Sequence, residues 1–128
     1  MQRSAPQSPG TTEGSGPLSP LERTVLTAML KGEGAGFAAL RAQLAGATVV
    51  SRTHSGVGFV TRINVPDQLA AVPEAATPRL KAVLAAHPQL TERAEFLLQL
   101  RGGRLAVLEA YCVEGSWPAD EAEFLVVG

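Results

Sequence analysis

The chain has 128 residues, of which 45% are hydrophobic and 18% are charged, and its formal net charge is −1. This length suits a single domain with one hydrophobic core, and the apolar content exceeds that of a disordered protein. The small net charge gives no general attraction to nucleic acid or anionic lipid, so we expect neither as a partner. With no secretory signal, no apolar run approaching ~20 residues and a single cysteine, we expect a soluble, cytoplasmic protein.

The first 17 residues are mainly Ser, Pro, Gly, Thr, Gln and Ala. Such a segment buries too little apolar surface to offset the entropy of ordering it. We therefore predict a disordered tail over residues 1–17 and a single α+β domain over residues 18–128.

Two helices are predicted directly after this tail. Ser19, Pro20 and Glu22 supply a cap, a favoured first residue and the acid that completes a capping box. Apolar side chains then recur every three or four residues until Gly32 ends the helix, and a second, shorter helix ends at Gly46. The predicted buried stripes are Leu21, Val25, Leu26 and Met29, and then Phe37, Leu40 and Leu44. We expect the two helices to form a hairpin that lies across a sheet.

Two β-hairpins are predicted in the rest of the chain. Residues 48–54 and 57–65 are rich in β-branched side chains and flank Ser55-Gly56, which predicts a two-residue turn. Apolar side chains also alternate over residues 96–100 and 105–113, on either side of a Gly102-Gly103 turn.

The remaining segments are less regular. Residues 67–78 read as a loop, residues 79–87 fit either a helix or a strand, and residues 124–127 suit a final strand. The expected fold class is α+β, with two N-terminal helices packed on a twisted antiparallel sheet of four to five strands.

A set of short motifs is spread over residues 18–118. They are SR at 51–52, GVGF at 56–59, AEFLL at 94–98, GRL at 103–105, LE at 108–109, Tyr111 and WP at 117–118. This pattern resembles a group of small bacterial proteins that have no assigned function. The resemblance implies an extended conformation for residues 79–87 and implies no activity. The chain departs from the pattern at Ala110 and Cys112, where those proteins tend to have Gly and Thr.

No catalytic, metal or cofactor motif is recognisable. Cys112 lies in an alternating strand with no base nearby in the sequence, which is typical of a small core residue. Because one cysteine and the distant His54 and His87 lack metal-ligand spacing, we expect no metal. Gly56-Val57-Gly58 joins two strands instead of preceding a helix, so we interpret it as a turn and expect no cofactor. His87 precedes a proline and is interpreted as a loop residue, and we favour a protein without enzymatic activity.

The most informative charges are Arg52 and Glu109. The assumed turn places Arg52 opposite Phe59, on the face of Val50, Val57 and Ile63. Glu109 shares its predicted face with Phe96, Leu98, Leu100, Leu105 and Val107. Charges on apolar faces are costly unless they are neutralised. Three hypotheses remain open: a structural salt bridge between them, a pocket in which Arg52 binds an anion and Glu109 is an acid or base, or a register that differs from the assumed one.

Tyr111 and Trp117 are the single tyrosine and the single tryptophan. They either close one end of the core or form an exposed aromatic patch for another protein. From Glu114 to the end there are four acids and no base, which is typical of a solvated surface or of a surface for a basic target.

The candidate binding residues are Arg52, His54, Glu109, Tyr111 and Trp117. The favoured function is a non-catalytic protein-interaction module, such as an immunity-type inhibitor or a small adaptor that binds another protein. The alternative is a small-ligand-binding protein or enzyme whose pocket is centred on Arg52 and Glu109. No pattern in the sequence indicates an oligomeric state.

Overall fold

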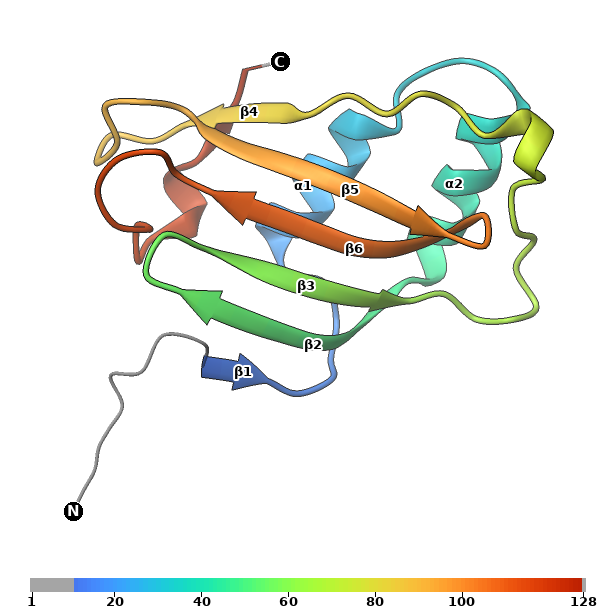
Figure 1. Ribbon diagram of the computed structural model, residues 1–128, viewed down its shortest axis with the longest axis horizontal. Coiled ribbons are helices and arrows are strands. Elements are labelled where there is room, and N and C mark those ends of the chain that lie inside the picture. The colour runs from blue at the N-terminus through green and yellow to red at the C-terminus, as the bar shows by residue number, and fades with distance from the viewer. Residues whose placement is uncertain (1–10, 128) are drawn as a thin grey trace.

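A computed structural model describes residues 11–127, and it confirms the α+β class. The chain forms a seven-stranded antiparallel sheet. Both helices lie behind the sheet in Figure 1, which is viewed from the side that the helices leave uncovered. The sheet is larger than the predicted four to five strands because the ambiguous segment and the C-terminal segment both form strands, and residues 11–13 add an edge strand that was not predicted.

The elements follow the predicted order. The helices are α1 (Pro20–Met29) and α2 (Ala35–Gly46), and the strands are β1 (Thr11–Glu13), β2 (Thr48–Ser55), β3 (Gly58–Asn64), β4 (Val83–Ala86), β5 (Ala94–Arg101), β6 (Arg104–Tyr111) and β7 (Leu125–Val126). The strands lie side by side in the order β1-β2-β3-β6-β5-β4-β7. Short 3-10 turns lie at Glu74–Ala76 and Glu121–Glu123. Residues 83–86 are therefore extended, as the resemblance implied, and the final strand is also present.

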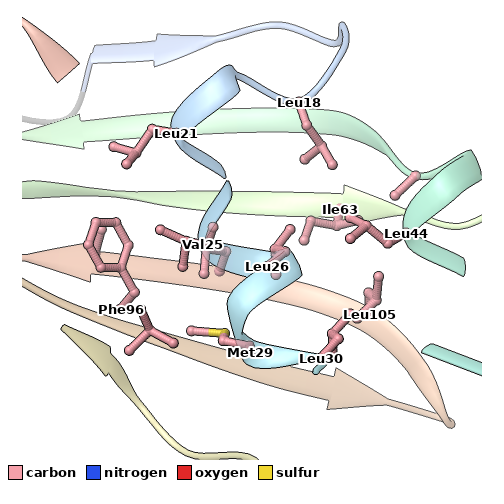
Figure 2. Close-up of a cluster of buried hydrophobic side chains, with 14 of the residues drawn as sticks. Leu18, Leu21, Val25, Leu26, Met29, Leu30, Leu44, Ile63, Phe96 and Leu105 are labelled. Carbon is pink, nitrogen blue, oxygen red and sulfur yellow. The ribbon is translucent and has the colours of Figure 1, made fainter. Parts of the chain in front are cut away.

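Helix α1 begins where the sequence predicts. The Glu22 N–H donates to Ser19 Oγ at 3.0 Å, and the Ser19 N–H donates to Glu22 Oε1 at 2.8 Å, which completes the capping box. The predicted stripe of Leu21, Val25, Leu26 and Met29 is buried. Figure 2 shows these side chains between α1 and the sheet, near Phe96, Leu105 and Ile63. Burial of this stripe holds α1 against the sheet.

The two hairpins differ in how well the sequence predicts them. Gly102 and Gly103 form the predicted turn between β5 and β6 and have φ of 59° and 76°, a region that favours glycine. In the first hairpin, Ser55 pairs with Gly58, so the turn consists of Gly56-Val57 and not Ser55-Gly56. The first turn therefore lies one residue later than predicted.

Part of the predicted disordered tail is paired with the sheet. Strand β1 adds to β2 along residues 52–54, and Gly16 exchanges two backbone hydrogen bonds with Val49, at 3.1 and 2.7 Å. Residues 1–10 lie outside the described part of the chain. The prediction of disorder is wrong for residues 11–13 and 16 because a backbone can pair with a sheet edge without contributing apolar side chains.

A buried glutamine joins α2 to two loops. Gln43 Nε2 donates to the carbonyls of Ala70 and Gly103, both at 2.9 Å, and Gln43 Oε1 accepts from the Leu105 N–H at 3.0 Å. The Gln43 side chain is fully buried, so these three bonds satisfy its polar atoms inside the core. Within residues 11–127, neither helix has the length and apolar run that crossing a membrane requires.

Candidate functional site

Arg52 forms an ion pair with Glu22 of α1, on the helix-facing side of the sheet. Its Nε donates to Glu22 Oε2 at 2.8 Å and its Nη2 donates to Glu22 Oε1 at 2.6 Å, while the Thr61 hydroxyl also donates to Oε2. Glu22 is fully buried, whereas the Arg52 side chain is 15% exposed.

These contacts also set the ionisation of Glu22. Burial raises the pKa of this carboxyl, but hydrogen bonds from Arg52, Thr61 and the Ser19 N–H, with the charge of Arg52, hold the pKa below its ordinary 4.5. Glu22 is therefore a buried carboxylate whose acceptors are satisfied, and the arrangement is that of a structural ion pair.

Glu109 does not reach Arg52, so the predicted pair is wrong. Arg52 lies opposite Thr61, which is fully buried on the helix-facing side. Glu109 lies between Val60 and Leu97 in the sheet register, and these two side chains are 39% and 37% exposed on the other side. The two charges occupy opposite faces of the sheet, which excludes both a salt bridge and a shared pocket.

An extra residue in β6 explains the position of Glu109. Gln99 pairs with Val107 and Leu100 pairs with Leu105, so Ala106 is left without a partner of its own. Such a bulge reverses the facing of every later side chain in the strand. As a result Val107 and Glu109 turn away from the helices.

The faces of the first hairpin are predicted only in part. Arg52 does share the helix-facing side with Phe59 and Ile63, but it lies opposite Thr61 and not Phe59. Val50 and Val57 are 44% and 46% exposed, contrary to the prediction. The later turn and an irregularity in β2 between Val49 and Ser51 account for these differences.

Trp117 packs among aromatic rings at one end of the core. Its ring centroid lies 5.6 Å from Phe59, 6.0 Å from Phe96 and 4.9 Å from Phe124. Ala110 lies between Phe59 and Phe96 in the sheet register, so these two rings flank a small side chain on the helix-facing side. Of the two alternatives, the position of Trp117 fits a core cap.

The five candidate residues do not gather at one place. His54 lies opposite Phe59 on the helix-facing side, with the two ring centroids 6.2 Å apart. Tyr111 lies on the other side of the sheet, where its hydroxyl donates to Glu95, and this hydrogen bond raises the pKa of Tyr111. Arg52, His54 and Trp117 are thus separated by the sheet from Glu109 and Tyr111.

His87 lies directly after β4 and outside the helices and strands, as the sequence predicts, but it is buried and hydrogen-bonded. It is 4% exposed, its Nδ1 accepts from the Gln89 N–H at 3.0 Å, and its Nε2 lies 2.8 Å from the Asp120 carbonyl. Because Nδ1 accepts, Nε2 carries the proton and donates to Asp120. His87 therefore ties the C-terminal segment to the sheet.

The thiol of Cys112 and the carboxylates of Asp120 and Glu121 lie in environments that stabilise the fold. Cys112 is buried, as predicted for a core residue, and burial raises the pKa of its thiol. Glu121 accepts from the Trp117 indole N–H at 2.8 Å, and the Asp120 carboxylate accepts from the Ala122 N–H at 3.0 Å. Residues 11–127 contain no group of three or more His, Cys, Asp or Glu side chains that is arranged to hold a metal ion.

The structure also reveals a surface that the sequence did not indicate. We call the side of the sheet that faces away from both helices the open face (Figure 1). Arg62, Arg101 and Arg104 help to line a hollow of about 270 Å³ at one end of it. Val60 and Leu97 are exposed nearer its middle. The alternation of side chains along β3 and β5 places Val60, Arg62, Leu97 and Arg101 away from the core. The order of the strands in the sheet then brings the side chains of the two strands to one surface.

Comparisons of the chain with protein-family models, with curated proteins and with solved structures found no match. The resemblance to small bacterial proteins therefore stays a prediction.

Proposed function

We propose that this protein is a non-catalytic protein-interaction module that binds its partner through the open face of the sheet. The observation that carries the proposal is the one-sided placement of the helices. Both helices cover the same face, and the opposite face exposes Val60 and Leu97, which are 39% and 37% accessible. Burying such side chains against a partner gains about 25 cal/mol per Å² of apolar surface.

The side chains around this apolar centre also suit a protein partner. Arg62 and Arg101 are exposed beside it, and Glu109 lies between Val60 and Leu97. Exposed apolar side chains bordered by arginines are common in protein interfaces, and Glu109 adds a charge that a partner must neutralise. We propose an adaptor or an immunity-type inhibitor in the cytoplasm, a reducing compartment that suits the free thiol of Cys112.

The test compares two variants of the full chain as bait in a cell extract. Val60→Lys with Leu97→Lys places two charges in the open face, at positions exposed enough to leave folding intact. Thr24→Lys with Thr27→Lys adds the same two charges to exposed positions of α1, on the other side of the molecule.

We expect a protein captured by the wild type to be captured by the α1 variant and lost from the open-face variant. Thermal melts of all three chains establish that they are equally folded. A partner that both variants retain equally would contradict the proposal, because it would bind outside the open face.

A further inference from the structure

The charged side chains of the open face are segregated by sign. Arg62, Arg101 and Arg104 lie together at the end nearest the β5–β6 turn. Glu95 and Glu109 lie toward the other end, where Glu95 is opposite Tyr111 in the register. In residues 11–127 no ion pair joins the three arginines to a carboxylate. Asp67 also lines the hollow beside these arginines, so that end carries three positive charges and one negative charge. The open face therefore has a net positive charge at one end and the negative charges of Glu95 and Glu109 toward the other.

One of these arginines is already held in place. Arg104 Nη1 donates to the Pro66 carbonyl at 3.1 Å, and Arg104 Nη2 donates to the Asp67 carbonyl at 3.3 Å. Carbonyl groups orient a guanidinium without neutralising its charge. Arg104 therefore stays charged, and with Arg62 and Arg101 it outnumbers Asp67 at this end of the open face.

Apolar side chains occupy the centre. Val60, Glu109 and Leu97 form one row across β3, β6 and β5, and Arg62, Val107 and Gln99 form the next row. Val60, Leu97 and Val107 therefore lie between the arginines of one end and Glu95 of the other. These two central rows also contain one charge each, Arg62 in the row nearer the positive end and Glu109 in the row nearer Glu95. Positive charge therefore precedes negative charge along the strands, with apolar side chains between and beside the charges.

We propose that the open face binds a second copy of this chain, face to face, about a two-fold axis that runs across the strands. This inference rests on the proposed function, because it concerns the same surface: a second copy covers the open face of the isolated protein, and a different protein that binds this face must displace it. Such an axis reverses the strand direction and keeps each strand opposite its own counterpart. The positive end of each copy then lies on the negative end of the other.

The register identifies the most direct charge pair. On β5, Leu97 and Gln99 flank the centre, Arg101 lies beyond one end and Glu95 lies beyond the other. The two-fold axis places Arg101 opposite Glu95 of the second copy, and repeats this contact by symmetry. Aligned sheets pack about 10 Å apart at roughly 30°, a distance that arginine and glutamate side chains can span.

A partner of uniform charge fits this face less well. An acidic protein or a nucleic acid would meet Glu95 and Glu109, and a basic protein would meet Arg62 and Arg101. Like charges brought together in an interface are unfavourable. A second copy presents both signs in the complementary order, and this charge complementarity favours it over the other partners.

The size of the face suggests a weak dimer. The four long strands have seven or eight residues each. At ~4.8 Å between strands and ~3.3 Å per residue, they span roughly 20 by 25 Å, or about 1,000 Å² over both copies. This area lies at the lower limit of specific interfaces, so we expect a dissociation constant in the micromolar range.

The test is a charge exchange followed by analytical ultracentrifugation of the full chain at low salt. Arg101→Glu alone and Glu95→Arg alone each place like charges together twice in the dimer, and each should raise the dimer dissociation constant at least ~10-fold. In an equimolar mixture of the two variants both contacts again join opposite charges. The mixture should therefore form a dimer with an affinity within ~3-fold of the wild type.

Two further variants serve as controls. Glu95→Gln can still accept the hydrogen bond from Tyr111 but lacks the charge, so it should also weaken the dimer if charge is responsible. Arg23→Glu changes an exposed arginine of α1, on the other side of the molecule, and should leave the dimer unchanged. Thermal melts check that every variant is folded.

Each negative result contradicts a different part of the proposal. A wild-type chain that stays monomeric overturns the second copy as partner, whereas the proposed function fails only if the captured partner ignores Val60→Lys with Leu97→Lys. A dimer that tolerates Arg101→Glu overturns the inference, because its interface lies elsewhere. Single variants that dissociate but do not dimerise when mixed also overturn it, because Arg101 and Glu95 then do not meet across a two-fold axis.

Discussion

Glu22 and Arg52, which are 30 residues apart in the sequence, are joined through both carboxylate oxygens, at 2.8 and 2.6 Å. The pair fixes the first turn of α1 to the centre of β2. Because the same Oε1 of Glu22 also accepts from the Ser19 N–H, one side chain caps the helix and attaches it to the sheet. The two partners differ in burial, and this difference leads to the first prediction.

Arg52→Met should destabilise the protein more than Glu22→Leu. The first change leaves a fully buried carboxylate without its countercharge, which typically costs about 3–5 kcal/mol. The second leaves an arginine that is already 15% exposed and can turn toward water. Urea unfolding followed by circular dichroism measures both losses, and the double variant should recover part of the Arg52→Met loss because no charge remains buried. Equal losses from the two single changes would contradict this account.

The same pair makes stability depend on pH. The pKa of Glu22 is lower in the folded protein than its ordinary 4.5, so the unfolded chain binds the proton more tightly. The contribution of the ion pair is therefore complete above pH 4.5 and is lost as the pH falls through the folded pKa. We expect the difference in unfolding free energy between the wild type and Glu22→Gln to be constant near neutral pH and to shrink in acid. If the two proteins lose stability in parallel, Glu22 is not the responsible group.

The elements that the sequence predicted well have local causes. The start of α1 depends on Ser19, Pro20 and Glu22, and the β5–β6 turn depends on Gly102-Gly103, so each signal lies within the element that it specifies. The burial of Glu22 could also have been predicted from the sequence. It lies three residues before Val25 and four before Leu26, which places it on the buried stripe of α1.

The features that the sequence did not predict depend on contacts between segments that are distant along the chain. The bulge at Ala106 has no local signature, yet it decides which face Glu109 occupies. The positive end of the open face depends on three arginines that come together only through the pairing of β3, β6 and β5. The alternation of side chains along β2 correctly predicts that Arg52 lies on the buried face. Its partner, Glu22, lies on α1, and the pattern of a strand does not specify where a helix packs on the sheet.

The third prediction concerns the first strand. A chain that begins at Leu18 lacks β1 and both hydrogen bonds between Gly16 and Val49, and it leaves the edge of β2 unpaired. At about 1 kcal/mol for each backbone hydrogen bond, we expect a loss of about 1–3 kcal/mol relative to a chain that begins at Thr11. Chemical denaturation of the two truncated chains measures the difference. Equal stability would mean that β1 contributes nothing beyond covering the edge.

The last prediction concerns Gln43. Gln43→Leu keeps a similar volume but removes three hydrogen bonds, which leaves the buried Leu105 N–H and the carbonyls of Ala70 and Gly103 without this partner. An unsatisfied buried group costs about 1–3 kcal/mol, so we expect a total loss of about 2–4 kcal/mol after water reaches the more exposed carbonyls. Gln68→Leu, at an exposed loop position, is the matched control and should change stability by less than about 0.5 kcal/mol. Hydrogen exchange gives an independent measurement, because the Leu105 amide should exchange faster in Gln43→Leu than the neighbouring amides of β6. Unchanged protection of that amide would show that the bond from Gln43 does not hold the start of the strand.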